Sequence, residues 1–314
     1  MDVLVLGAGV VGLTTAVTLV EAGHSVRVQA ADPPEATTSA AAGALWGPWL
    51  VEPRDRVHSW AAHTLHVLTE LAETPGTGVR LASGNDVSPV EHQSPHWFSL
   101  LPDVRPSMVN ERPAGYAHGV HYTAPLVNMP RHLAYLVDRL QRSDVDIEIT
   151  AVESLDEARS AAPIVVNCTG LGAGKLADDD QVFPIRGQQL VVSNPGIAEF
   201  LEVDTGESPD LIAIYPHGDH VVLGGTAERG SWNRAPDPTT AETILARCAA
   251  VQPLLRDAAV LEHRVGLRPT RPEIRLEEQF NGTGRIIHNY GHGGAGVSVA
   301  WGCAATVSDM VSRQ

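Results

Sequence analysis

The sequence predicts an α/β fold combined with an α+β part, and three observations lead to it. The N-terminal 30 residues alternate strand, glycine-rich turn, helix and strand. The same order of strand, glycine cluster and helix returns at the C-terminus. Between these ends lie short apolar runs separated by proline, glycine and aromatic residues, which is typical of β-rich structure. Two interleaved domains explain this alternation better than two consecutive ones.

The N-terminal segment predicts a complete βαβ unit. Residues 2–6 are uniformly apolar, as a buried parallel strand requires, and 13–22 have the small and aliphatic side chains of a packed helix. Gly23 ends this helix, and 24–30 form a second strand that ends near Asp32. Its length of about 30 residues is that expected of a βαβ unit.

The segment after this unit has unusually small side chains. Pro33 and Pro34 break regular structure, and 37–44 are too small-sided to form an ordinary packed helix. We expect another part of the molecule to approach this backbone closely.

The apolar spacing assigns the remaining elements. Helices are predicted over 57–71, 130–140, 239–251 and 297–312. Strands are predicted over 145–152, 164–167, 188–192, 211–215, 220–223 and 285–289, whereas 95–122 should hold strands and long loops.

This arrangement predicts a Rossmann-like domain interrupted by a discontinuous, β-rich domain. The first would comprise 1–55, 130–185 and 268–314, and the second 56–129 and 186–267.

Composition excludes several classes of partner. The chain has 314 residues and a formal charge of -15, which disfavours nucleic acids and anionic membranes because both attract clustered cations. No apolar run approaches the roughly 20 residues of a membrane-spanning helix. Three widely spaced cysteines fit neither a disulfide framework nor a zinc site. With no secretory signal and no peroxisomal address at 312–314, we expect a cytoplasmic protein.

The glycine-rich turn predicts dinucleotide binding. Gly7, Gly9 and Gly12 stand between a strand and a helix, with Ala8, Val10 and Val11 between them. This spacing gives a tight turn, lets a pyrophosphate approach the backbone, and places it at a helix N-terminus. Asp32, twenty residues after Gly12, is placed to accept hydrogen bonds from the ribose hydroxyls, although a surface aspartate is the alternative.

NAD and FAD share this fingerprint, so the choice of cofactor depends on other parts of the chain. The run 165–170, Val-Val-Asn-Cys-Thr-Gly, ends a strand in a small polar turn, as in flavoproteins of the glutathione-reductase-like class. An ordinary strand-to-loop junction is the alternative interpretation. Cys168 fits a buried small residue better than a nucleophile.

The run 288–298, His-Asn-Tyr-Gly-His-Gly-Gly-Ala-Gly-Val-Ser, resembles the signature of the D-amino-acid oxidase family. The resemblance extends over nearly the whole chain in order and spacing. It includes 7–12, 37–46, 152–154, 166–170 and the segment 266–272, Gly-Leu-Arg-Pro-Thr-Arg-Pro.

This resemblance implies that FAD is bound non-covalently. It places Thr37, Thr38, Ala42 and Gly43 on the flavin side and Val152 and Thr169 beside the adenosine half. The C-terminal cluster would offer backbone N–H groups to the charge of a reduced flavin, because it opens a helix. Its predicted cofactor-binding members are Gly293, Gly294, Gly296, Val297 and Ser298, and Gly294 is also a predicted active-site residue.

Arg268 is the predicted substrate anchor. In the family, the matching arginine forks onto the substrate carboxylate, a task for which a planar guanidinium is suited. A surface or interface salt bridge is the alternative for Arg268, and it is the favoured interpretation for Arg271 and Arg275.

The tyrosines depart from the family pattern. Ala213 stands where one of two familiar substrate-side tyrosines aligns, and 204–210 contains no second one. Tyr215 lies two residues beyond Ala213, on the same face of a strand, so we consider it an active-site candidate that reaches the substrate carboxylate. A packed strand tyrosine is the alternative.

Several other residues are given structural roles. Trp49 and Trp232 are possible pocket aromatics but fit the core better, and His292 fits a turn better than a base. His217 and His220 flank a hairpin turn, so no metal site is expected there.

The resemblance implies oxidative deamination of D-amino acids to 2-oxo acids, ammonia and hydrogen peroxide, with O2 as the electron acceptor. Oxidation of D-aspartate, glycine or sarcosine, and flavin binding without turnover, remain alternatives. An NAD-dependent dehydrogenase is disfavoured by the C-terminal glycines. A homodimer is expected only by analogy.

Overall fold

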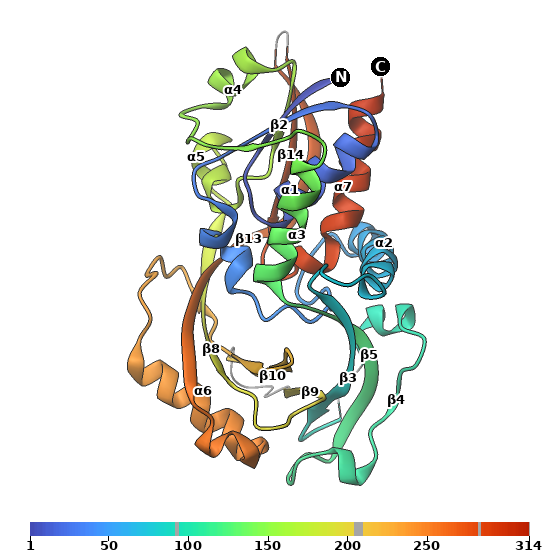
Figure 1. The fold of residues 1–314 in the computed structure, drawn as a ribbon, viewed down its shortest axis with the longest axis vertical. Coiled ribbons are helices and arrows are strands. Elements are labelled where there is room, and N and C mark those ends of the chain that lie inside the picture. Colours follow the sequence, from blue (N-terminus) through green and yellow to red (C-terminus); the bar gives the residue numbers. More distant parts are fainter. Residues whose placement is uncertain (92–93, 204–209, 282–283, 314) are drawn as a thin grey trace.

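The computed structural model describes residues 1–91, 94–203, 210–281 and 284–313. The molecule is elongated, with both termini at one end and a strongly curved sheet at the other (Figure 1). None of the helices in these ranges combines the length and apolar character that crossing a membrane needs.

Parallel strands form the end that carries the termini. Their order is β14-β7-β1-β2-β6, and all four of these pairings are parallel. The strands are β1 (Asp2–Leu6), β2 (Ser25–Ala30), β6 (Ile147–Ile149), β7 (Ile164–Asn167) and β14 (Gly284–His292). The predicted βαβ unit is confirmed, whereas the strand predicted over 145–152 is only three residues long.

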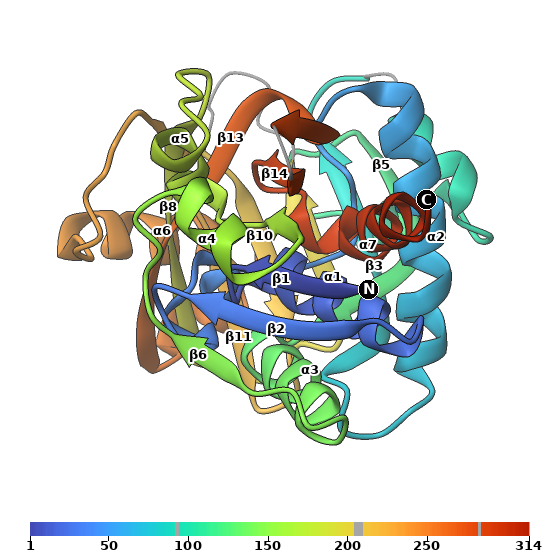
Figure 2. The same cartoon turned by 90° about the horizontal axis from the view of Figure 1, so that it is seen from above.

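Helices pack beside these strands. The helix α1 (Val10–Glu21) lies between α7 (Gly296–Ser312) and α3 (Met129–Gln141), and α2 (Arg54–Ala72) packs on α7 (Figure 2). All four helices were predicted to within three residues at each end. The short helix α4 (Leu155–Ala161), capped by the Ser154 hydroxyl, was not predicted.

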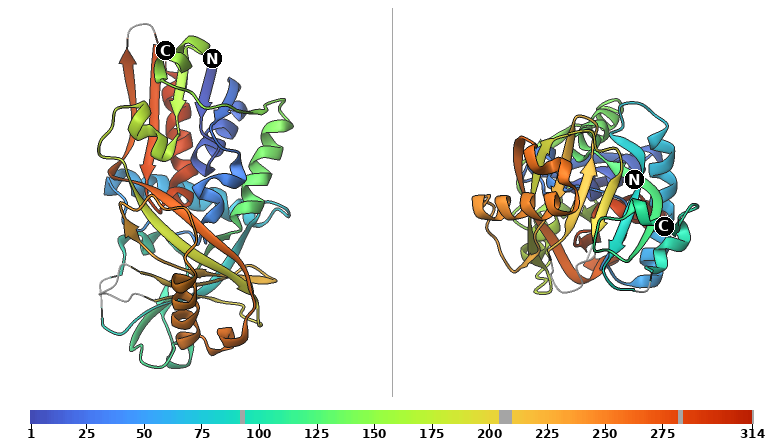
Figure 3. Two further views of the ribbon diagram at one scale, coloured as in Figure 1. Left: turned by 90° about the vertical axis from the view of Figure 1, so that its left-hand side faces the viewer. Right: turned by 90° about the horizontal axis from the view of Figure 1, so that it is seen from below.

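The opposite end is a mainly antiparallel sheet. The order β4-β5-β3-β9-β10-β11-β8-β13 contains one parallel pair, β3 with β9. The strands are β3 (Val79–Ser88), β4 (Arg105–Pro106), β5 (His118–Val127), β8 (Phe183–Ser193), β9 (Phe200–Val203), β10 (Ile212–Pro216), β11 (His220–Gly224) and β12 (Glu228–Arg229). One side of it is covered by α6 (Pro238–Val251) (Figure 3, right).

The strand β13 (Val260–Asn281) joins the two ends. Its first half pairs with β8 and its second half with β14, with a register shift between Thr270 and Arg275 (Figure 3, left). The strand therefore runs through the predicted domain boundary at 267/268. The domain boundaries themselves stay a prediction.

Short helical turns complete the chain. They are the 3-10 helices Pro34–Ala36, Thr38–Ala41, His96–Leu100, Val109–Glu111, Gly170–Gly172 and Pro253–Asp257, and the one-turn α5 (Ala173–Leu176). The second of these, Thr38–Ala41, confirms that 37–44 does not form an ordinary helix.

Candidate active site

The glycine turn lies between β1 and α1 and packs against the end of β7. Gly7 has φ +108°, and a Cβ there would lie 2.5 Å from the carbonyl oxygen of Cys168. A Cβ at Gly12 would lie 2.0 Å from the carbonyl oxygen of Gly7. Only glycine fits either position, and the turn leaves the first N–H groups of α1, from Val10 onward, at its open end.

Ser39 is a residue of this region that the sequence analysis missed. Its hydroxyl accepts a hydrogen bond from the backbone N–H of Val10, with 3.0 Å between Oγ and N. The hydroxyl thus occupies one of the unpaired donors at the helix N-terminus. No signal other than its place in the small-sided segment pointed to this contact.

The predicted adenosine-side residues lie at the carboxyl ends of neighbouring strands. Asp32 is exposed just beyond β2, and the N–H of Gly7 donates to the Gln29 carbonyl of that strand at 2.8 Å. Thr169, just beyond β7, donates from both its N–H and its hydroxyl to the side-chain oxygen of Asn167. Val152 is half-buried between β6 and α4.

The small-sided segment packs against the curved sheet. A Cβ at Gly266 would lie 3.3 Å from the side chains of both Thr38 and Ala41, and a Cβ at Gly43 would lie 2.7 Å from the ring of Tyr215. The Thr38 hydroxyl also donates to the carbonyl of Leu267 at 3.0 Å. The expected close approach is confirmed, and its partner is the β-rich part of the molecule.

The C-terminal glycine cluster opens α7 beside the first turn. A Cβ at Gly296 would make ordinary contact, 3.9 Å, with the side chains of Val10 and Val11. The Ser298 hydroxyl accepts from the N–H of Gly47 at 3.0 Å, and the N–H of Gly293 donates to the Pro269 carbonyl at 2.8 Å. The N-termini of α1 and α7 therefore lie close together, and both favour negative charge.

Arg268 lies across the sheet with its guanidinium over a glycine. A Cβ at Gly187 would lie 2.6 Å from both of its terminal nitrogens, and a Cβ at Gly294 would lie 3.5 Å from its Cδ. One terminal nitrogen donates to the Thr226 carbonyl at 3.0 Å. Among the described residues no carboxylate lies within salt-bridge distance, and burial lowers the pKa of Arg268. A half-buried guanidinium with free donors is suited to binding an anion.

Unlike Arg268, the neighbouring arginines form salt bridges with acidic side chains. Arg271 pairs with Asp179 at 3.0 Å, and Arg275 pairs with Glu277 at 2.7 Å. Both contacts confirm the salt-bridge interpretation of these two residues.

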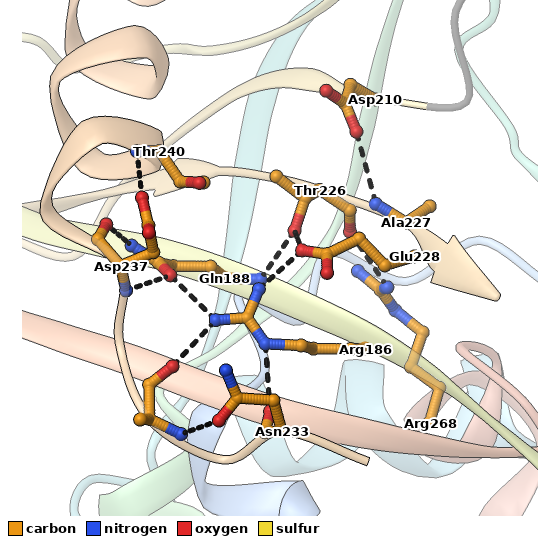
Figure 4. A network of polar contacts seen from close by, with 11 residues as sticks. Arg186, Gln188, Asp210, Thr226, Ala227, Glu228, Asn233, Asp237, Thr240 and Arg268 are labelled. Atoms are coloured by element: carbon orange, nitrogen blue, oxygen red, sulfur yellow. Dashed lines mark hydrogen bonds and ion pairs between the residues drawn. The ribbon is translucent and has the colours of Figure 1, made fainter. Parts of the chain in front are cut away.

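A polar network fixes the segment that holds Arg268 (Figure 4). The buried Arg186 donates to the carbonyls of Asn233 and Ala235, both at 2.8 Å, and also pairs with Glu228. Thr226, whose carbonyl contacts Arg268, donates its hydroxyl to Glu228. The guanidinium of Arg268 is thus held against a segment that is itself pinned to β8.

Tyr215 forms a hydrogen-bonded group with two residues from other strands. Its hydroxyl donates to one carboxylate oxygen of Glu202, and the Tyr122 hydroxyl donates to the other at 3.0 Å. Burial and the charge of Glu202 raise the pKa of Tyr215, while the charge of Arg268 acts in the opposite direction. The predicted contact of Tyr215 with a substrate carboxylate stays a prediction, and Glu202 was not among the predicted site residues.

Two aromatic residues lie elsewhere than expected. Trp49 is 40% exposed and Trp232 is 62% exposed, so the core interpretation was wrong for both. Trp49 contacts Trp97 edge-on, with 5.3 Å between ring centroids. Both side chains belong to loops outside the strands that could have buried them.

The other structural interpretations hold. Cys168 is buried, and this burial raises the pKa of its thiol to about 12, which makes it a poor nucleophile. His292 is buried in the turn before α7, where burial lowers its pKa to about 4. His217 and His220 stack across the turn between β10 and β11. The missing second tyrosine was sought in 204–210, of which 204–209 lie outside the described residues.

This fold and site define a dinucleotide-binding protein of the flavoprotein type, in which two helix N-termini face a curved sheet. The model of the family described as "FAD dependent oxidoreductase" matches residues 2–310. The chain therefore belongs to the FAD-dependent oxidoreductase family, and its cofactor is FAD.

Named relatives narrow the comparison. A D-amino-acid oxidase of Rubrobacter xylanophilus is 49% identical over 306 residues, covering 96% of this chain and 93% of the relative. A D-amino-acid oxidase of Streptomyces coelicolor is 44% identical, covering 99% and 97%. Among solved structures, glycine oxidase from Geobacillus kaustophilus has a TM-score of 0.83 at 18% identity, covering 100% and 95%.

Proposed function

We propose that this protein is a D-amino-acid oxidase, which converts a D-amino acid, O2 and water into a 2-oxo acid, ammonia and hydrogen peroxide. The observation that carries the proposal is Arg268, a guanidinium beside the glycine cluster at the start of α7 that has no acidic partner among the described residues. Two relatives that bear this name and match over nearly the whole chain support it.

The residues at hand fit FAD. Gly7 and Gly12 have no room for a side chain, as the tight turn and close helix packing of a dinucleotide-binding motif require, and Gly9 stands at the position whose backbone a pyrophosphate would approach. The N-termini of α1 and α7 add two sites that favour negative charge, one for the pyrophosphate and one for the reduced isoalloxazine. When bound, FAD accepts two electrons from the substrate and passes them to oxygen.

Arg268 would position the substrate. Two parallel N–H donors bind the carboxylate and fix the direction of the Cα–H bond, while the Thr226 carbonyl holds the guanidinium in place. Because no described histidine or carboxylate pairs with Arg268, orientation and electrostatics would supply most of the rate. The D preference would follow from the side of the anchored carboxylate on which the substrate side chain fits.

Product analysis tests this function. With D-alanine as substrate, we expect equal amounts of O2 consumed and of hydrogen peroxide, pyruvate and ammonia formed. L-Alanine serves as the control and should give none of them. Pyruvate without oxygen consumption would contradict the oxidase assignment.

Two further features rest on less direct grounds, the oligomeric state on family analogy and the location on the sequence analysis. We propose a homodimer and a cytoplasmic location, which size-exclusion chromatography and fractionation of the source cells would test.

A further inference from the structure

We propose that Glu202 selects D-amino acids whose side chains carry a positive charge, such as D-lysine and D-arginine. This inference rests on the proposed function and names its substrate class. It starts from the two faces of the curved sheet.

One face of the curved sheet is apolar and packs against α6. Ile212 and Ile214 of β10 and Val203 of β9 belong to a buried cluster with Ile244 and Cys248 of α6. Because side chains alternate along a strand, the residues between them point to the other face.

The opposite face carries Glu202, Ala213 and Tyr215. This face contacts the segment that the family resemblance places on the flavin side, since the Tyr215 ring lies where a Cβ of Gly43 would be. Arg268 also lies on this face, over Gly187 of β8. Glu202 and the proposed carboxylate anchor are therefore on the same side of the sheet.

The register places Glu202 at the end of a row that leads toward Arg268. Glu202 pairs with Ala213, and Ala213 pairs with Gly224, so both positions between are small. Thr226, which holds Arg268, lies two residues beyond Gly224. Glu202 and Gly224 are two strand spacings apart, roughly 10 Å, and Gly187, which lies beneath the Arg268 guanidinium, belongs to β8, one strand further. A substrate anchored on Arg268 would thus extend its side chain over Ala213 toward Glu202.

The carboxylate of Glu202 has hydrogen bonds but, within the described part of the chain, no counter-charge. Tyr215 and Tyr122 each donate to one of its oxygens, while no described cation lies within salt-bridge distance of it. Arg80 of β3 donates to the carbonyl of Pro216. Asp86, the register partner of Glu202 in β3, is 5% exposed and adds a second carboxylate to the row.

A cationic side chain would complete this arrangement. Each carboxylate oxygen that accepts one hydroxyl still has a lone pair for a second donor, and the ammonium of lysine is a point charge on a flexible stem of about four carbons. The acidic side chain of D-aspartate would instead meet like charge. The geometry therefore favours basic over neutral and acidic substrates.

Substrate kinetics of the holoenzyme test the inference. For the unaltered protein, we expect kcat/KM for D-lysine to exceed that for D-norleucine, its uncharged analogue, by roughly tenfold or more, as a charge-assisted contact contributes. Glu202→Gln keeps the shape and should remove most of the preference for D-lysine over D-norleucine. Glu70→Gln, on the exposed side of α2, is the matched control and should leave the preference unchanged.

Ligand binding gives a readout without turnover. We expect 6-aminohexanoate to perturb the flavin absorbance at a lower concentration than hexanoate, and Glu202→Gln to bring the two dissociation constants together. Equal binding of both ligands to the unaltered protein would overturn the inference.

The outcomes separate the two proposals. Rapid oxidation of D-norleucine with no preference for D-lysine would overturn the role of Glu202 and leave the D-amino-acid oxidase assignment intact. If Glu202→Gln fails to retain FAD, the comparison of 6-aminohexanoate with hexanoate on the unaltered protein decides the question. Failure of every D-amino acid to reduce the flavin would overturn the proposed function itself.

Discussion

The surroundings of Arg268 distinguish it from the other arginines nearby in the sequence. Its sequence context, between glycine and proline, suggested restricted geometry but did not distinguish it from Arg271 and Arg275 without the family resemblance. The structure does, because both neighbours have acidic partners and no described carboxylate pairs with Arg268. The unpaired guanidinium is the clearest anion-binding group of the candidate site.

Replacing Arg268 should impair catalysis more than folding. We expect Arg268→Ala to raise KM and lower kcat/KM by roughly a hundredfold or more, since it removes a buried charge-assisted pair with the substrate. Arg268→Lys should recover only part of this loss because it cannot bind bidentately. Steady-state kinetics with flavin content measured in parallel checks this, and Arg54→Lys, at an exposed pair with Glu52, is the control. Near-normal kinetics of Arg268→Ala would remove it from the substrate site.

Glu202 could not have been found from its local sequence. It stands in Phe-Leu-Glu-Val, a short segment without a motif, and its partners Tyr122 and Tyr215 come from strands far away in the chain. Only the pairing of β3, β9 and β10 brings these side chains together. The departure at Ala213 was visible in the sequence, but its register partner Glu202 was not.

At the scale of elements, prediction succeeded where the signal was local. The βαβ unit and α7 have glycine turns and continuous apolar faces, so their positions followed from the sequence. In contrast, β3 has the mixed sequence Val-Arg-Leu-Ala-Ser-Gly-Asn-Asp-Val-Ser and was missed. Its stability depends on pairing with β5 and β9, and this kind of information is not contained in the segment itself.

The contact between α2 and α7 depends on one glycine. A Cβ at Gly302 would lie 2.3 Å from the carbonyl oxygen of Trp60, and the N–H of Gly302 donates to the Thr64 hydroxyl at 3.0 Å. We expect Gly302→Ala to lower the free energy of unfolding by about 2–3 kcal/mol through overpacking.

Thermal unfolding of the holoprotein measures this effect. Gly174→Ala is the matched control, because its Cβ would come no closer than 3.5 Å to the nearest atom given by the structure. Equal melting temperatures for both variants would contradict the close helix contact.

At the scale of the whole molecule, buried histidines make stability depend on pH. Burial lowers the pKa of His132, His288 and His292 to about 4 each, from an ordinary value of 6.5. Between these values the unfolded chain takes up protons that the folded protein does not, so stability is complete above pH 6.5 and falls as the pH approaches 4. We expect the melting temperature to be several degrees lower at about pH 5 than at about pH 7.5.

A single substitution tests the origin of this pH dependence. His132→Gln should reduce the difference between the two melting temperatures, since His132 is buried and its Nδ1 contacts the Thr77 carbonyl at 2.8 Å. His66→Gln, at a side chain that is 70% exposed, should leave the difference unchanged. An unaltered pH dependence in His132→Gln would show that other groups cause it.

The strand β13 connects the two ends of the molecule because it is part of the sheet in both. The first half of this strand supports the proposed substrate face, and the second half pairs with β14, which leads into the glycine cluster. Arg268 lies near the middle, between the FAD end and the curved sheet. Sequence patterns located both ends but not this continuous strand, which contains prolines at 269 and 272.

The most direct test of the central claim is an anaerobic absorbance spectrum of the purified holoprotein mixed with D-lysine, D-norleucine or D-alanine and with their L-enantiomers. We predict yellow flavin bands that are bleached by the D-enantiomers and restored when oxygen is admitted. Flavin that stays oxidised with every D-amino acid, or that is bleached equally by the L-enantiomers, would contradict the account.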